Sequence, residues 1–150
     1  MDGCSNQYGK GAWGYAVSSA LALRSSNHYN VPVNALLGIV GVESNYGANT
    51  TPPIGSDGRL IDSSVGLIQA QNGWWQQYAK GHSLDERTDN ALAMDMLAKY
   101  ISDAMNGLNT THHEHMSLEQ AIASFHIGMG AEEAAMAGNQ KQIDAGNHYL

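Results

Sequence analysis

Apolar residues recur along this chain with the spacing of an α-helix, and no stretch alternates with the period of two that marks a half-buried β-strand. One helix is predicted to begin at Pro32, because proline suits the first helical turn. It is predicted to run to about Tyr46, since Gly47 is a natural C-terminal stop. We therefore expect a mainly α-helical fold with at most a short β-hairpin, which we place within residues 48–67.

Other helices are predicted on both sides of that segment. One covers residues 12–26. Its expected apolar stripe consists of Trp13, Ala16, Val17, Ala20 and Leu21. Asp89 is a suitable N-cap for a second helix, and Ser117 with Gln120 forms the S-x-x-Q capping box of a third. A short helix is expected over residues 131–137.

The length and composition fit one globular domain. A chain of 150 residues with 43% hydrophobic residues can bury a real core, and we expect a single domain over residues 1–150 with its core at about 12–138. Cys4 is the only cysteine, so no disulfide forms within the chain. No apolar run approaches the ~20 residues that span a bilayer. The first residues also lack the pattern of a signal peptide.

The charge balance excludes one class of partner. The formal net charge is −7, and the chain has only 7 lysines and arginines, so we expect no nucleic-acid binding, which needs a basic patch. His112, His113 and His115 surround Glu114, but their spacing fits no zinc signature. We expect this cluster to lie in a solvated loop, and we expect no metal and no cofactor.

One carboxylate stands out in the helix that begins at Pro32. Leu36, Ile39, Val40 and Glu43 follow the i, i+3, i+4, i+7 spacing of a single helical face. Burying a carboxylate without a partner is costly, and desolvation raises a carboxyl pKa, so Glu43 is a candidate general acid. The alternative is that Glu43 ends the helix at its rim and faces water.

Two later segments complete an ordered set of three sequence blocks. The first is Glu43-Ser44, the second is Gly66-Leu67-Ile68-Gln69 within residues 63–69, and the third is Ser124-Phe125-His126-Ile127-Gly128. Together they resemble the soluble lytic transglycosylase domain, with its E-S, G-L-M-Q and A-Y-N-A-G blocks, and the related goose-type lysozymes. The resemblance covers about residues 31–130. It implies a lysozyme-like helical fold and cleavage of peptidoglycan between N-acetylmuramic acid and N-acetylglucosamine.

The resemblance also implies roles for individual residues. Glu43 would act first as an acid and then as a base, while the 6-hydroxyl of the sugar closes a 1,6-anhydro ring. The substrate-binding residues would be Ser44, Asn45, Tyr46, Ser64, Gly66, Gln69, Phe125 and His126. Gly66 would let a sugar approach the backbone closely, because glycine has no Cβ. Phe125 and His126 stand where the family has tyrosine and asparagine, so the ring is kept and the phenolic hydroxyl is lost.

Two alternatives to the transglycosylase remain open. A goose-type lysozyme hydrolyses the same bond with water and would use Asp57 or Asp62 as a second carboxylate. That family carries an acidic residue two positions after the glutamine of the second block, and this chain has Gln71 there, which favours the transglycosylase. The other alternative is a glycan-binding module without activity, supported only by the departures in the third block.

Trp74 and Trp75 follow the second block directly. We expect one of them in the core and the other partly exposed; the alternative is that they stack on a sugar ring. The expected partner is the glycan strand of peptidoglycan, bound by a monomer. The expected place of action is the cell wall, reached from the periplasm, from outside the cell or as part of a virion.

Overall fold

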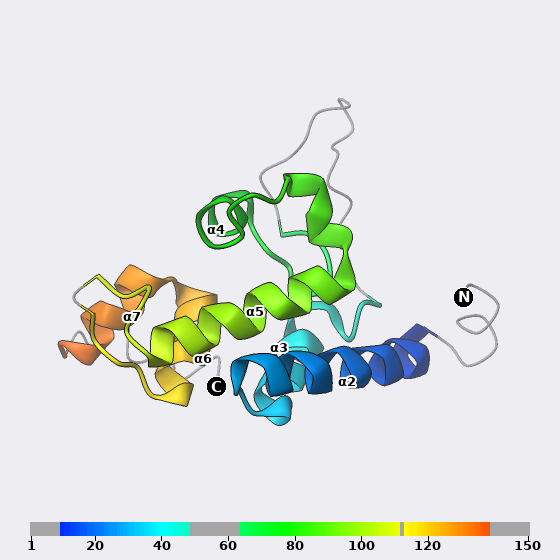
Figure 1. The fold of residues 1–150 in the computed structure, drawn as a ribbon, viewed down its shortest axis with the longest axis horizontal. Coiled ribbons are helices and arrows are strands. Elements are labelled where there is room, and N and C mark those ends of the chain that lie inside the picture. Colours follow the sequence, from blue (N-terminus) through cyan, green and yellow to red (C-terminus); the bar gives the residue numbers. More distant parts are fainter. Residues whose placement is uncertain (1–9, 49–63, 112, 139–150) are drawn as a thin grey trace. The chain divides into compact units, whose positions relative to one another are not determined.

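The computed structural model describes residues 10–48, 64–111 and 113–138, and this part of the chain is mainly α-helical (Figure 1). Its elements are α2 (Lys10–Tyr29), α3 (Val33–Ser44), α4 (Asn72–Tyr78), the 3-10 helix η1 (Leu84–Thr88), α5 (Asn90–Met105), α6 (Leu118–Ile127) and α7 (Met129–Met136). Within the described ranges no strand forms, and the β-structure is an isolated antiparallel bridge between Val65 and Ala70. The prediction of a mainly helical, lysozyme-like fold is confirmed.

Of residues 48–67, in which we expected a hairpin, the structure describes residue 48 and residues 64–67. The bridge pairs Val65 with Ala70, so it extends beyond the segment of residues 48–67 in which we placed a hairpin. Residues 49–63, which include Asp57 and Asp62, lie outside the described part of the chain.

The chain divides into two compact units, one ending at Ala98 and the other beginning at Lys99. The boundary falls within α5, so one continuous helix contributes residues to both units. The single domain over residues 1–150 stays a prediction.

In the first unit, α2 packs against α3 (Figure 1). The buried side of α2 carries Ser18, Ala22 and Ser25, which follow an i, i+4, i+7 spacing. The predicted apolar stripe is wrong, because Ala16 and Ala20 are exposed. Val17 and Leu21 of that stripe are half-buried, and nothing is described for the side chain of Trp13.

Polar contacts explain why hydrophobicity misplaced the buried face of α2. Asp95 of α5 accepts a hydrogen bond from the Ser25 hydroxyl at 2.5 Å and pairs with the Arg24 guanidinium at 3.1 Å. Hydrogen bonds to a charged group are stronger than neutral ones. Ser25 therefore faces inward although it is polar, and the pattern of apolar residues along the sequence does not indicate its burial.

Helix α3 carries the apolar face that the sequence predicted. Leu36, Ile39 and Val40 are buried, and the helix begins directly after Pro32. It ends at Ser44, two residues earlier than predicted. The chain leaves the helix before Gly47 because Asn45 already adopts the left-handed conformation.

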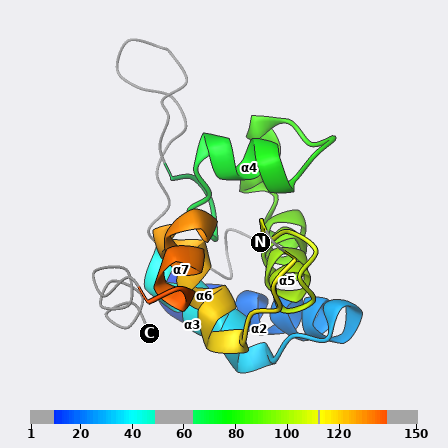
Figure 2. The same ribbon diagram turned by 90° about the vertical axis from the view of Figure 1, so that its left-hand side faces the viewer.

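In the second unit, α6 and α7 lie next to each other (Figure 2). The predicted capping box opens α6: the Gln120 amide donates to the Ser117 hydroxyl at 3.2 Å, and the Ser117 amide donates to the Gln120 side chain at 2.9 Å. Gly128, with φ of 99°, separates the two helices. Helix α7 covers Met129–Met136, close to the segment predicted.

Among the helices that the structure describes, none is long and apolar enough to cross a bilayer.

Candidate active site

Glu43 lies one residue before the end of α3. Its side chain is half-buried, while Leu36, Ile39 and Val40 of the same predicted face are buried. Glu43 therefore lies at the boundary between the apolar core of the first unit and its surface. This position lies between the two arrangements that the sequence left open, the buried face and the solvent-facing rim.

The turn after Glu43 is strained. Asn45, Tyr46 and Gly47 all have positive φ, at 48°, 57° and 88°. The Tyr46 amide donates to the Val40 carbonyl at 3.3 Å, six residues back, as in a Schellman motif. A non-glycine residue in this conformation costs roughly 1–2 kcal/mol. Surrounding contacts must therefore hold the turn in place.

The ring of Tyr46 supplies some of those contacts. It meets the ring of Tyr15 edge-on, with 5.0 Å between the ring centroids. It also lies over Gly41, where an added Cβ would stand 2.8 Å from the Tyr46 hydroxyl. The Tyr46 carbonyl oxygen comes closer still to Gly14 of α2, where an added Cβ would overlap it. Tyr46 is half-buried and Asn45 is exposed, so both keep surface on which the predicted substrate contacts can form.

Ser44 joins the first sequence block to the second. Its side chain is fully buried, and its hydroxyl donates to the Leu67 carbonyl at 2.6 Å. The same hydroxyl accepts a hydrogen bond from the Gly47 amide at 2.9 Å. One side chain thus holds both the strained turn and the neighbouring block, so the residues next to Glu43 and the residues around Leu67 form one local structure.

The second block forms a tight loop closed by the bridge. The Val65 amide donates to the Ala70 carbonyl at 3.1 Å, and the Ala70 amide donates to the Val65 carbonyl at 3.0 Å. Within the loop, the Gln69 side-chain amide donates to the Gly66 carbonyl at 2.9 Å. Gln69 has a φ of 51° and is half-buried, whereas the remaining residues of the loop are buried. Gln69 is therefore the residue of the block with accessible surface.

Gly66 has a structural reason to be glycine. Its φ is 82°, and an added Cβ would overlap the carbonyl oxygen of Arg87. The backbone that approaches Gly66 closely in the structure is that of Arg87, and not a ligand. The predicted approach of a sugar to Gly66 stays a prediction. Ser64, which comes before the bridge, is half-buried.

The third block lies in the second unit, on α6. Ser124 is buried, and its hydroxyl lies 2.8 Å from the hydroxyl of Tyr100. Phe125 is half-buried with its ring centroid 6.1 Å from that of Tyr100, and His126 is exposed. The structure therefore brings the first and second blocks together in one unit and places the third block in the other.

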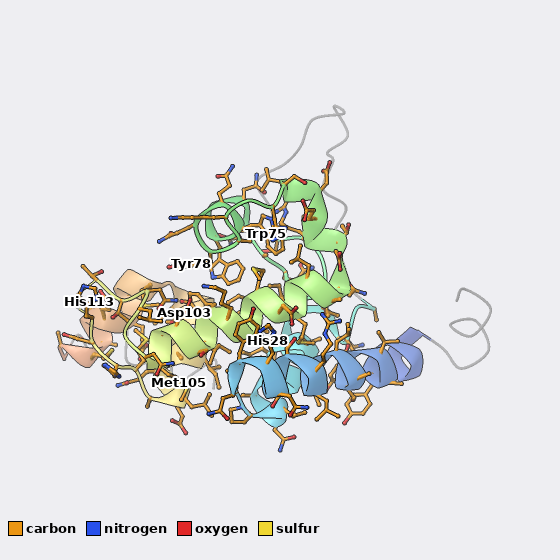
Figure 3. The ribbon with its side chains drawn as sticks, viewed as in Figure 1. His28, Trp75, Tyr78, Asp103, Met105 and His113 are labelled. Atoms are coloured by element: carbon orange, nitrogen blue, oxygen red, sulfur yellow. The ribbon has the colours of Figure 1, made fainter. Side chains whose placement is uncertain are left out.

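The two adjacent tryptophans differ as predicted. Trp75 is fully buried, and its indole N–H donates to the Ser83 carbonyl at 2.9 Å. Trp74 is half-buried, with its ring centroid 5.4 Å from that of Tyr78. Figure 3 labels Trp75 and Tyr78, both of which extend from α4.

The histidine cluster is solvated as far as it is described. His113, Glu114 and His115 are exposed, and His112 lies outside the described residues, as does Cys4. Within the described ranges, no three or more histidine, cysteine or acidic side chains come together as metal ligands would.

Sequence reasoning missed Arg87. Its side chain is fully buried in η1, and its guanidinium donates to the Leu84 carbonyl at 2.9 Å and to the Ala70 carbonyl at 3.0 Å. Arginine is rarely fully buried, so no sequence pattern singles it out. The nearest available signal is the S-x-x-E capping box of Ser83 and Glu86, which opens the helix that carries it.

A family model described as "Transglycosylase SLT domain" matches residues 9–145, a range that includes all three sequence blocks. Comparisons with curated proteins and with solved structures found no significant match. The matched range extends through both compact units of the chain.

Proposed function

This chain belongs to the transglycosylase SLT domain family, and from that premise we propose that it is a peptidoglycan lytic transglycosylase. The reaction is cleavage of the β-1,4 bond between N-acetylmuramic acid and N-acetylglucosamine, leaving a 1,6-anhydro end. The observation that carries the proposal is the hydrogen bond between Ser44 and Leu67, because it joins the block that holds Glu43 to the block that holds Gln69.

Glu43 is the proposed general acid. It protonates the glycosidic oxygen as the bond from that oxygen to the muramic acid C1 breaks. The resulting carboxylate then takes the proton of the 6-hydroxyl as this oxygen bonds to C1, so the carboxyl is regenerated and no water is consumed. Its half-buried position next to the fully buried Ser44 supports this role, because the residue is anchored beside the core and still keeps accessible surface.

The other predicted site residues divide by their exposure. Gln69, Asn45 and Tyr46 keep accessible surface, so we assign them to substrate contact. Ser44 and Gly66 are buried, so we assign them to positioning rather than to direct contact. Ser64, Phe125 and His126 also keep accessible surface and stay proposed substrate contacts.

The competing hydrolase needs a second carboxylate to orient water. Gln71, where that family has an acidic residue, is exposed at the N-cap of α4 and offers only an amide. This residue favours the transglycosylase. The proposed partner is the glycan strand of peptidoglycan, bound by a monomer that acts at the cell wall.

The test is the activity of Glu43→Gln on purified peptidoglycan, with Glu119→Gln as the matched control. Glu119 is an exposed glutamate in the first turn of α6. The amide of Glu43→Gln cannot cycle a proton, and general acid–base catalysis contributes about 10²–10⁴-fold. We expect Glu119→Gln to keep its activity and Glu43→Gln to lose it while staying folded.

More than a tenth of the wild-type activity in Glu43→Gln would remove Glu43 from the acid role. A wild type that binds peptidoglycan but releases no product would show instead a glycan-binding module.

A further inference from the structure

Arg87 is a cation with no exposed surface in a chain that has only 7 lysines and arginines. Burying a charge is costly unless hydrogen bonds compensate it. Two such bonds come from different nitrogens of the guanidinium: Nε donates to the Leu84 carbonyl at 2.9 Å and Nη1 donates to the Ala70 carbonyl at 3.0 Å. Arg87 therefore joins its own helical turn to the end of the second sequence block.

The carbonyl that Arg87 reaches is the one that closes the loop. The Ala70 oxygen also accepts the hydrogen bond from the Val65 amide at 3.1 Å. The side chain of Arg87 thus reinforces the bridge that sets the shape of the loop between Val65 and Ala70. A charged donor makes a stronger hydrogen bond than a neutral one.

The main chain of Arg87 contacts the other end of the same loop. Its carbonyl oxygen lies so close to Gly66 that no Cβ fits there. One residue thereby holds the loop at both ends, through its side chain at Ala70 and through its backbone at Gly66. On the side of α3, the Ser44 hydroxyl holds the middle of the loop at Leu67.

The helical turn that carries Arg87 is itself fixed. Ser83 and Glu86 form a complete capping box at the start of η1. The buried Trp75 of α4 donates its indole N–H to the Ser83 carbonyl. The guanidinium is therefore held in place before any substrate arrives.

We propose that Arg87 is a positioning residue for catalysis. It fixes the conformation of the loop from Gly66 to Gln69, so that the Gln69 side chain contacts the sugar whose glycosidic bond Glu43 cleaves. This inference rests on the proposed function. It also explains why the residue is arginine: the planar guanidinium presents Nε and Nη1 in a fixed fork toward two carbonyls, whereas lysine has a single rotating ammonium.

The experiment compares the full-length wild type with Arg87→Lys, and uses Arg24→Lys as the matched control. Arg24 is exposed and pairs with Asp95, so lysine there keeps the ion pair. Two quantities are measured: kcat and KM on peptidoglycan, and the hydrogen exchange of the Val65 and Ala70 amides. We expect Arg87→Lys to stay folded, to exchange these two amides faster than the wild type, and to lose kcat/KM by about 10- to 100-fold, the size of effect that misplaced groups produce.

The exchange of the α5 amides separates a local role from a general loss of stability. If Arg87 acts on the loop, α5 amides keep their wild-type exchange while those of Val65 and Ala70 do not. Unchanged kcat/KM together with unchanged exchange in a folded Arg87→Lys would overturn the inference.

Two further outcomes are decided in the wild type alone. If Arg87→Lys does not fold, the hydrogen exchange of the wild type is measured at increasing urea concentrations instead. We expect the Val65 and Ala70 amides to exchange only through global unfolding, because Arg87 holds the loop. Exchange of these amides through a local opening at lower urea would overturn the inference. If the wild type releases no product, the proposed function fails, and the catalytic part of the inference fails with it. The exchange data still decide whether Arg87 holds the loop.

Discussion

The Ser44 hydroxyl donates a hydrogen bond of 2.6 Å to the Leu67 carbonyl, and both groups are buried. These residues are far apart in the sequence and belong to separate blocks, so this bond is the contact through which one block positions the other. It also explains why serine directly follows the proposed acid. A hydroxyl at this position can donate to Leu67 and accept from Gly47 at the same time.

Removing that hydroxyl should cost stability. Ser44→Ala leaves the Leu67 carbonyl and the Gly47 amide without their partner, and a buried polar group left unsatisfied costs about 1–3 kcal/mol. Urea unfolding measures the loss. Ser19→Ala is the control, because the Ser19 hydroxyl donates to the Tyr15 carbonyl of its own helix rather than to another part of the fold. Equal unfolding free energies for the two variants would contradict the role given to Ser44.

Two glycines should respond in opposite directions to the same substitution. In Gly66→Ala the added Cβ would overlap the Arg87 carbonyl oxygen, and the alanine would also have to keep a positive φ. The left-handed conformation alone costs roughly 1–2 kcal/mol, so we expect this variant to be destabilised by more than that. Gly73→Ala adds its Cβ in open space on α4 and should stabilise by about 0.4–1 kcal/mol. Thermal unfolding of both variants checks the contrast, and a neutral Gly66→Ala would show that the loop moves freely away from Arg87.

Much of the helical framework follows from local chemistry. The apolar spacing of Leu36, Ile39 and Val40 predicts the buried face of α3, and the capping pair of Ser117 and Gln120 predicts the start of α6. Asp89 caps α5 as expected, with its carboxylate accepting from the Leu92 amide at 3.1 Å. In these cases the determining contacts are close in the sequence.

The parts that were missed depend on contacts between distant residues. The buried face of α2 follows from the bond between Ser25 and Asp95, which hydrophobicity does not reveal. The burial of Arg87 depends on the Ala70 carbonyl, and the turn that ends α3 packs through Tyr46 against Tyr15 and Gly14 of α2. For the site, the sequence indicated which blocks matter, but it did not distinguish buried Ser44 from accessible Gln69.

Stability should depend on pH through Glu132 of α7. Burial raises the pKa of this carboxyl above its ordinary value of 4.5. A carboxyl with a raised pKa binds its proton more tightly in the folded state, so its contribution to stability is present below pH 4.5 and is lost as the pH rises through the folded value. Glu132→Gln should therefore gain stability relative to the wild type at neutral pH and less at pH 4. Urea unfolding at both pH values measures the difference, and a gain that does not change with pH would show that the carboxyl is not desolvated.

The two aspartates of the hydrolase alternative should be dispensable. We expect Asp57→Asn and Asp62→Asn each to reduce peptidoglycan cleavage by less than about tenfold, ~1.4 kcal/mol. The reason is that an intramolecular 6-hydroxyl needs no second carboxylate to bring it to C1. Initial rates on purified peptidoglycan measure the effect, and a collapse in either variant would favour a hydrolase.

Mass spectrometry of the products formed from peptidoglycan in ¹⁸O-labelled water distinguishes a lytic transglycosylase from a hydrolase most directly. A lytic transglycosylase that uses the 6-hydroxyl as nucleophile leaves ends that weigh one water less than hydrolytic ends and carry no label. We predict those unlabelled anhydro ends for the wild type and their absence for Glu43→Gln. Labelled reducing ends of full hydrolytic mass would contradict the proposed transglycosylase reaction and identify a hydrolase.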